Sequence, residues 1–170
     1  MSAVLIRREL PTDVDAIFAV HRGAFETELE ANLVVALRAD EGWLPALSLV
    51  AVDAGEVVGH VVCTRGHVAS APALGLGPLG VLPAHQRTGV GAALMHAVLA
   101  AADAMDESVV VLLGHSTYYP RFGFVPAGEL HITPPVPDWA GEHFQARPLT
   151  AYTPAVRGEF GYAAPFQDLD

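Results

Sequence analysis

The chain has 170 residues, of which 52% are hydrophobic and 16% charged, and its formal net charge is −10. This length and composition predict one globular domain over residues 1–170. All nine basic residues are arginines. An acidic protein cannot displace the counterions of a nucleic acid, so we expect neither DNA nor RNA as a partner. A surface of this charge keeps a protein soluble, which is the simpler interpretation, and it would also favour cationic partners such as amines.

The sequence also bears on location. No apolar run approaches the roughly 20 residues that span a bilayer, and the opening MSAVLIRREL lacks the order of a signal peptide. Cys63 is the only cysteine, so the chain cannot form an internal disulfide. We therefore expect a cytoplasmic protein without membrane contact, in which Cys63 lies buried and inert in the middle of a strand.

The first half of the chain shows one strand pattern, then two helix patterns, then two more strand patterns. A short strand is predicted at 4–7, a helix from Thr12 or Asp13 to about Ala24, and a second helix over 28–39. Two β-runs follow, and the turn residues Asp53–Glu56 between them predict a hairpin. These runs cover residues 47–52 and 57–63.

The second half predicts a βαβ unit. A strand is expected over 75–81, an amphipathic helix after Gly89, and a continuous apolar strand over 109–113. Such a crossover makes the two strands parallel. From about residue 128 the chain is proline-rich, with weaker strand patterns at 144–149 and 158–163.

The run LGLGPLGV raises a question of cofactor, because Gly75, Gly77 and Gly80 match the G-x-G-x-x-G spacing of a dinucleotide loop. That loop needs a strand before its first glycine and a helix after its last. No convincing strand pattern precedes Gly75, and Pro78 and Pro83 favour an extended segment. The pattern therefore argues against a nicotinamide or flavin enzyme.

The second glycine cluster, QRTGVGAAL, leads directly into the predicted helix. Gly89 and Gly91 let a phosphate approach the backbone closely, and the free N–H groups of the first helical turn favour an anion. Arg87 can add a positive charge. The cluster lacks the G-K-[ST] of a nucleoside-triphosphate loop. It predicts a pyrophosphate site, with a tightly packed helix start as the structural alternative.

Two segments, Leu79–Leu94 and Tyr119–Phe124, together resemble the signatures of the GNAT superfamily of N-acetyltransferases. The first is similar to the acetyl-coenzyme A signature, and the second to the Tyr-x-x-x-Gly-Phe segment that follows the next strand. Within the superfamily, the sequence resembles the YhbS-type subgroup. Further residues that fit it are Ser48–Ala51, Val58–His60, Gly77–Val81, Leu113-Gly114 and Pro126-Ala127.

The resemblance implies an α/β (α+β) GNAT fold with a twisted mixed sheet of about six or seven strands and about four helices. Two central parallel strands splay apart, and coenzyme A enters the gap. The glycines around Pro78 then permit a bulge that separates the strands. The resemblance also implies the residues that bind acetyl-CoA, chiefly through their backbone groups. They are Leu79, Gly80 and Val81 for the pantetheine arm, and Gln86, Arg87, Thr88, Gly89, Val90, Gly91 and Ala92 around the pyrophosphate.

The implied reaction is direct attack of an amine on the acetyl thioester. Tyr119 matches the family position of the general acid that protonates the leaving thiolate, with packing between helix and sheet as its structural alternative. We expect the neighbouring Tyr118 to point elsewhere and pack. No motif identifies the general base, for which Glu28, Glu30 and His115 are candidates. Many family members have an asparagine after the second central strand, where this chain has Gly114–Thr117.

The remaining expectations concern ligands and partners. The eight histidines show no metal-binding spacing, so no metal is expected. The acceptor is an amine of a small molecule or a peptide, and its identity cannot be read from the chain. A homodimer is left open. The alternative function is a non-catalytic acyl-CoA-binding sensor or partner protein, which could dispense with Tyr119.

Overall fold

A computed structural model describes residues 3–168. Within them, nine strands form a mixed sheet whose main path runs β1-β2-β3-β4-β5-β8-β6, with β9 beside β3 and β7 beside β9. The strands are β1 (Leu5–Arg8), β2 (Ser48–Asp53), β3 (Glu56–Val68), β4 (Ala71–Val81), β5 (Val109–Leu113), β6 (Val125–Pro126), β7 (Ile132–Thr133), β8 (Phe144–Pro148) and β9 (Gly158–Gly161). The α-helices are α1 (Val14–Ala24), α2 (Leu29–Arg38) and α3 (Val90–Ala104).

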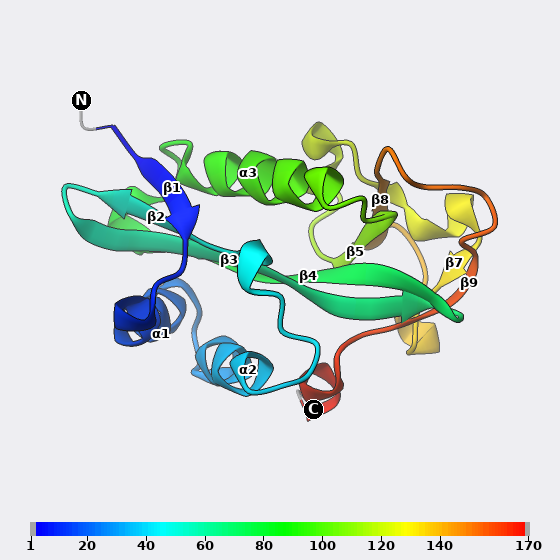
Figure 1. Cartoon of the computed structure of the whole chain (residues 1–170), viewed down its shortest axis with the longest axis horizontal. Helices are drawn as coiled ribbons and strands as arrows, with labels where there is room; N and C mark the ends of the chain where they lie inside the picture. Colours follow the sequence, from blue (N-terminus) through cyan, green and yellow to red (C-terminus); the bar gives the residue numbers. More distant parts are fainter. Residues whose placement is uncertain (1–2, 169–170) are drawn as a thin grey trace.

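The sheet separates two layers of helix. Helices α1 and α2 cover one face and α3 covers the other, as Figure 1 shows. Leu94 and Met95 of α3 are fully buried against the sheet together with Leu112 of β5. On the opposite face, Ile17 of α1 and Val34 of α2 form a smaller buried cluster. The apolar stripe of each helix thus covers one face of the sheet.

The expected fold class is confirmed, although the counts differ. We predicted six or seven strands and four helices, and residues 3–168 contain nine strands and three α-helices. Two of the extra strands, β6 and β7, have only two residues each. The other helical segments are 3₁₀ turns of three to five residues. Six of these turns have proline at their first or second position, where its fixed φ suits a helical start.

Strand β4 begins at Ala71, four residues before the expected start, so the prediction that no strand precedes Gly75 is wrong. Residues 71–74 include Pro72 and two alanines, which give a weak strand pattern. Antiparallel pairing with β3, from Val68↔Ala71 to Gly59↔Val81, overrides that preference.

The central strands do separate, as predicted. β4 and β5 are parallel and pair only at Leu74↔Val110 and Gly75↔Val111. Just beyond, the register between β3 and β4 shifts, because Cys63 faces Leu76 whereas Val61 faces Leu79. Gly77 has φ +141°, a value that residues with a side chain rarely adopt. This irregularity directs the rest of β4 away from β5.

Candidate active site

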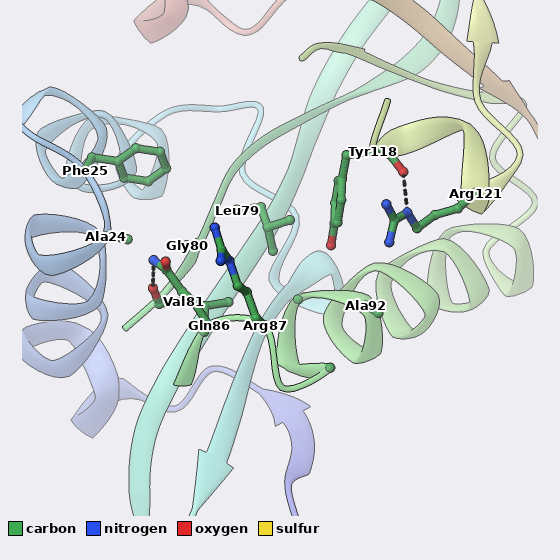
Figure 2. A pocket seen from close by; sticks show the side chains of 12 residues that line it. Ala24, Phe25, Leu79, Gly80, Val81, Gln86, Arg87, Ala92, Tyr118 and Arg121 are labelled. Carbon is green, nitrogen blue, oxygen red and sulfur yellow. Dashed lines mark hydrogen bonds between the residues drawn. The ribbon is translucent and has the colours of Figure 1, made fainter. Parts of the chain in front are cut away.

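A cavity with a volume of about 630 Å³ lies where β4 leaves β5. Figure 2 shows Ala24, the last residue of α1, and Phe25, which follows it, on one wall, Tyr118 and Arg121 on the opposite wall, and Arg87 between them. Its lining residues are Ala24, Phe25, Leu79, Gly80, Val81, Gln86, Arg87, Gly89, Gly91, Ala92, Tyr118 and Arg121.

One wall of the cavity is the edge of β4. Gly80 pairs with His60 of β3 on one side, while β5 pairs with β4 only as far as Gly75. Among residues 3–168 no other strand pairs with Leu79–Val81. Backbone N–H and C=O groups on an unpaired strand edge can bond to an extended ligand, as they would to another strand.

The start of α3 forms the floor beside that edge. Gly89 precedes the helix with φ +93°, and no side chain caps the first turn. The loop before it is held by its own side chains, since Gln86 Nε2 donates to the Val81 carbonyl at 3.0 Å and Thr88 Oγ1 donates to the His85 carbonyl at 2.5 Å. Uncapped N–H groups of a 15-residue helix, with the adjacent Arg87, form a site suited to an anion.

The two adjacent tyrosines occupy different places. Tyr118 lines the cavity, and a Cβ added to Gly91 would lie only 3.1 Å from its hydroxyl. Its ring lies under the Arg121 guanidinium, 4.7 Å away. The expectation that Tyr118 points away from the site is therefore wrong. The ring of Tyr119 packs more deeply instead, against Gly114 at the end of β5 and edge-on to Phe124.

Burial determines the state of the Tyr119 phenol. Loss of solvent, with a smaller contribution from Tyr118, raises the pKa of Tyr119 to about 12. The hydroxyl therefore keeps its proton at neutral pH and can act as a donor. The Tyr119 ring packs directly on Gly114, where a Cβ would lie only 2.5 Å from the ring, so a residue with a side chain at 114 would displace it.

Eight of the ten residues expected to bind the cofactor line this cavity. Thr88 and Val90 do not, because the Thr88 hydroxyl bonds within its own loop and the Val90 side chain, at the start of α3, is buried in the core between the helix and the sheet. Sequence reasoning missed Ala24, Phe25 and Arg121. Arg121 had a usable signal, since it follows Tyr119 by two residues in the segment already singled out. Ala24 and Phe25 had no local signal, because their position depends on how α1 packs on β4.

The three candidate bases lie elsewhere. Glu28 is exposed and pairs with Arg22 at 3.3 Å. Glu30 has one oxygen, Oε2, that is buried without a hydrogen bond. His115 is exposed, and its carbonyl accepts from Gln145. None of the three lines the cavity.

Other predicted features can be placed as well. Cys63 is fully buried, and burial raises the pKa of its thiol, so it is not a nucleophile. In residues 3–168 no three His, Cys, Asp or Glu side chains gather closely enough to hold a metal ion. Over the same range, no helix has the length and apolar character needed to cross a bilayer.

Comparison with known proteins agrees with this geometry. Residues 45–126 match the acetyltransferase (GNAT) domain family. The Escherichia coli K12 protein YjhQ, named as an uncharacterized N-acetyltransferase, is 38% identical over 151 residues, which are 82% of this chain and 83% of YjhQ. YhbS from the same strain is 37% identical over 124 residues, 71% of this chain and 73% of YhbS.

Solved structures are similar too. E. coli YhbS in complex with CoA superposes with a TM-score of 0.89 and 31% identity, covering 98% of this chain and 93% of that one. A Brucella melitensis GNAT acetyltransferase in complex with acetyl-CoA has a TM-score of 0.78 and 32% identity, with 96% and 98% covered. The family inferred from the two signature segments is thus confirmed: this chain belongs to the GNAT family of N-acetyltransferases.

Proposed function

We propose that this protein moves an acetyl group from acetyl-CoA to a primary amine of a small molecule or a peptide, by direct attack of the amine. The observation that carries the proposal is the single cavity in which an unpaired strand edge, Leu79–Val81, meets the uncapped start of α3. YhbS, whose fold matches over nearly the whole chain, was solved with CoA.

The residues present fit such a molecule. An extended pantetheine arm would bond to the free edge of Leu79–Val81, and a pyrophosphate would lie at the N–H groups between Gln86 and Ala92. Gly91 keeps the helix start clear, because a side chain there would meet the Tyr118 hydroxyl. Arg87 and Arg121 supply positive charge at the cavity wall of a chain whose net charge is −10.

Acetyl-CoA supplies an activated carbonyl carbon bonded to sulfur. The chain must hold it, exclude water, give a proton to the departing sulfur and take one from the attacking nitrogen. We assign the first proton to Tyr119, whose phenol stays protonated because its pKa is raised to about 12. A neutral donor suits the apolar cluster around Phe122 and Phe124, since it brings no charge there.

The acceptor class rests on charge and on chemistry. Direct attack needs an amine, and an acidic surface concentrates cationic molecules near it. We propose a cytoplasmic location because the one cysteine is a buried thiol with no disulfide partner. A second copy of the chain as partner stays an open prediction.

Two measurements test the proposal. Acetyl-CoA should raise the melting temperature, because a ligand that binds only the folded state stabilises it. Release of free thiol should then depend on an added amine, within a panel of polyamines, amino acids, aminoglycosides and peptides. Tyr119→Phe should lower that rate about 100-fold with CoA affinity unchanged.

The outcomes separate enzyme from binding module. Binding without thiol release for any amine would favour the non-catalytic acyl-CoA sensor. No thermal shift at millimolar acetyl-CoA would contradict both. An unchanged rate in Tyr119→Phe would contradict only the role given to that hydroxyl.

A further inference from the structure

A chain of hydrogen-bonded side chains connects α1 with the edge of the sheet. His21 of α1 and His60 of β3 are fully buried, with His21 Nε2 and His60 Nδ1 2.8 Å apart. His60 Nε2 lies 2.8 Å from Ser48 Oγ, which lies 2.8 Å from Glu9 Oε1. Arg38 donates to both oxygens of Glu9, at 2.7 and 3.0 Å. This series of hydrogen bonds thus ends at the Glu9 carboxylate, which Arg38 binds through both oxygens.

That carboxylate fixes the direction of every bond. A carboxylate only accepts, so the Ser48 hydroxyl donates to Glu9, and Ser48 Oγ must accept from His60 Nε2–H. A neutral imidazole has one N–H, so His60 Nδ1 accepts from His21 Nε2–H. His21 Nδ1 is then left with a free lone pair. It is buried and has no hydrogen-bond partner.

Both rings are neutral at physiological pH. Burial, with the Arg38 charge, lowers the pKa of His21 to about 4. Burial lowers the pKa of His60 well below its usual range, and the charges of His21 and Arg38 act in the same direction. The assignment of one N–H to each ring therefore applies over the working range of most enzymes.

The free lone pair lies directly behind the wall of the cavity. A Cβ added to Gly80 would be 2.7 Å from His21 Nδ1. Ala24 follows on the same helix, and the Phe25 ring stacks on His21 at 6.0 Å. Gly80, Ala24 and Phe25 all line the cavity. His21 itself does not line the cavity, and its Nδ1 is shielded from solvent. The proposal below therefore requires the wall formed by Gly80, Ala24 and the partly exposed Phe25 to open, so that an amine can reach Nδ1.

Buried acceptors are almost always paired in native proteins, so an unpaired one beside a reaction cleft calls for a role. We propose that His21 Nδ1 is the proton acceptor of acetyl transfer and that His60, Ser48 and Glu9 form a relay that stabilises the accepted proton. The inference rests on the proposed function, whose missing component is a base. It names a residue of α1 instead of Glu28, Glu30 or His115.

The proton balance is complete. As the amine nitrogen bonds to the acetyl carbon and the carbon–sulfur bond breaks, one N–H proton passes to His21 Nδ1. His21 Nε2–H then passes to His60 Nδ1, His60 Nε2–H to Ser48, and the Ser48 proton to Glu9. No imidazole has to keep a positive charge in the core. Tyr119 has meanwhile given its proton to the leaving sulfur. When the products leave, water in the cleft carries one proton from His21 Nδ1 to the Tyr119 phenolate, the relay runs back, and both groups regain their first state.

The first test needs no variant. In ¹⁵N-histidine NMR spectra of the wild-type protein, His21 and His60 should both carry the proton on Nε2, with Nδ1 bare. A His21 ring that carries its proton on Nδ1 has no free lone pair toward Gly80, and it would overturn the proposal.

The second test is kinetic, with acetyl-CoA and the best amine of the panel. His21→Gln keeps an N–H that can donate to His60 but cannot accept a proton, so kcat should fall about 100-fold or more while the CoA affinity holds. His67→Gln is the matched control, because His67 is an exposed residue of β3 away from the cavity. It should leave kcat unchanged.

A double-mutant cycle distinguishes a relay from a packing role. Ser48→Ala should slow the wild type about tenfold and have no further effect on kcat in the His21→Gln background. Additive effects on kcat, or turnover in folded His21→Gln within threefold of wild type, would overturn the role of His21 alone. No turnover by the wild type with any amine would overturn the proposed function, and this role with it.

Discussion

Gly75 and Gly80 of β4 both face the α1–α2 side of the sheet, but different aromatic rings pack over them. Gly75 is paired on both sides, with Thr64 of β3 and Val111 of β5, and lies under the Tyr162 ring. Gly80 is paired with β3 alone and lies under the His21 ring. Between them, a Cβ on Gly77 would meet nothing within 4 Å.

The difference separates two uses of glycine in one strand. At Gly75 the missing side chain admits an aromatic ring into a closed core, where Tyr162 meets Phe160 and Phe166. At Gly80 it admits a titratable ring behind a reaction cleft. Packing of Tyr162 over Gly75 should therefore contribute to the free energy of unfolding at any pH. Burial of His21 over Gly80 should make that free energy depend on pH.

The largest expected effect is this pH dependence. The pKa of folded His21 is about 4, below the usual 6.5 that we take for the unfolded chain. The unfolded chain therefore binds a proton first as the pH falls, and the free energy of unfolding should drop between pH 6.5 and 4. His21 alone contributes about 3 kcal/mol to this loss, and His60 adds to it in the same direction.

Urea denaturation at pH 7, 6, 5 and 4 measures that loss. His21→Gln should flatten the curve, whereas His67→Gln should leave its slope unchanged. Asp13, whose pKa is lowered by Arg7, weakens the fold only below its usual value of 3.8, outside this window. A free energy that stays constant between pH 7 and 5 would mean that His21 is not neutral and buried in the folded state.

The second effect concerns Gly75, the glycine of β4 that is paired on both sides and covered by Tyr162. Gly75→Val should lower the free energy of unfolding by about 2 kcal/mol at every pH, because its Cβ would lie 2.8 Å from the Tyr162 ring. Gly161→Val is the control, since a Cβ at Gly161 of β9 meets nothing within 4 Å. Equal losses in the two variants would show that the clash with Tyr162 is not the cause.

The same comparison explains what the sequence could and could not predict. The βαβ unit was predictable, because the apolar run 109–113 and the glycine start of α3 carry strong local patterns. The separation of β4 from β5 was predictable from Gly77 and Pro78, which cannot continue a regular ladder. Eight cavity residues followed from the family resemblance.

The rest depends on contacts between segments far apart in the chain. His21 and His60 are 39 residues apart, and nothing in the local pattern around either indicates that their rings meet. Phe25 reads as an apolar helix residue until α1 is placed on β4. Tyr118 and Tyr119 are neighbours whose directions depend on Gly91 and Gly114, the two positions that leave room for their rings.

The smallest expected effect is on the affinity for CoA, from a substitution at Gly91 on the wall of the cavity opposite Gly80. Gly91→Val places a Cβ 3.1 Å from the Tyr118 hydroxyl and puts methyl groups beside the free N–H groups of α3. We expect the affinity for CoA, measured by calorimetry, to fall about tenfold, equal to about 1.4 kcal/mol. Stability should hold or rise slightly, because valine is a somewhat better helix former than glycine. Ala104→Val, at the far end of the same helix, should leave the affinity unchanged. If both variants bind CoA as the wild type does, the phosphates do not lie at the start of α3, and the open end of β4 has another ligand.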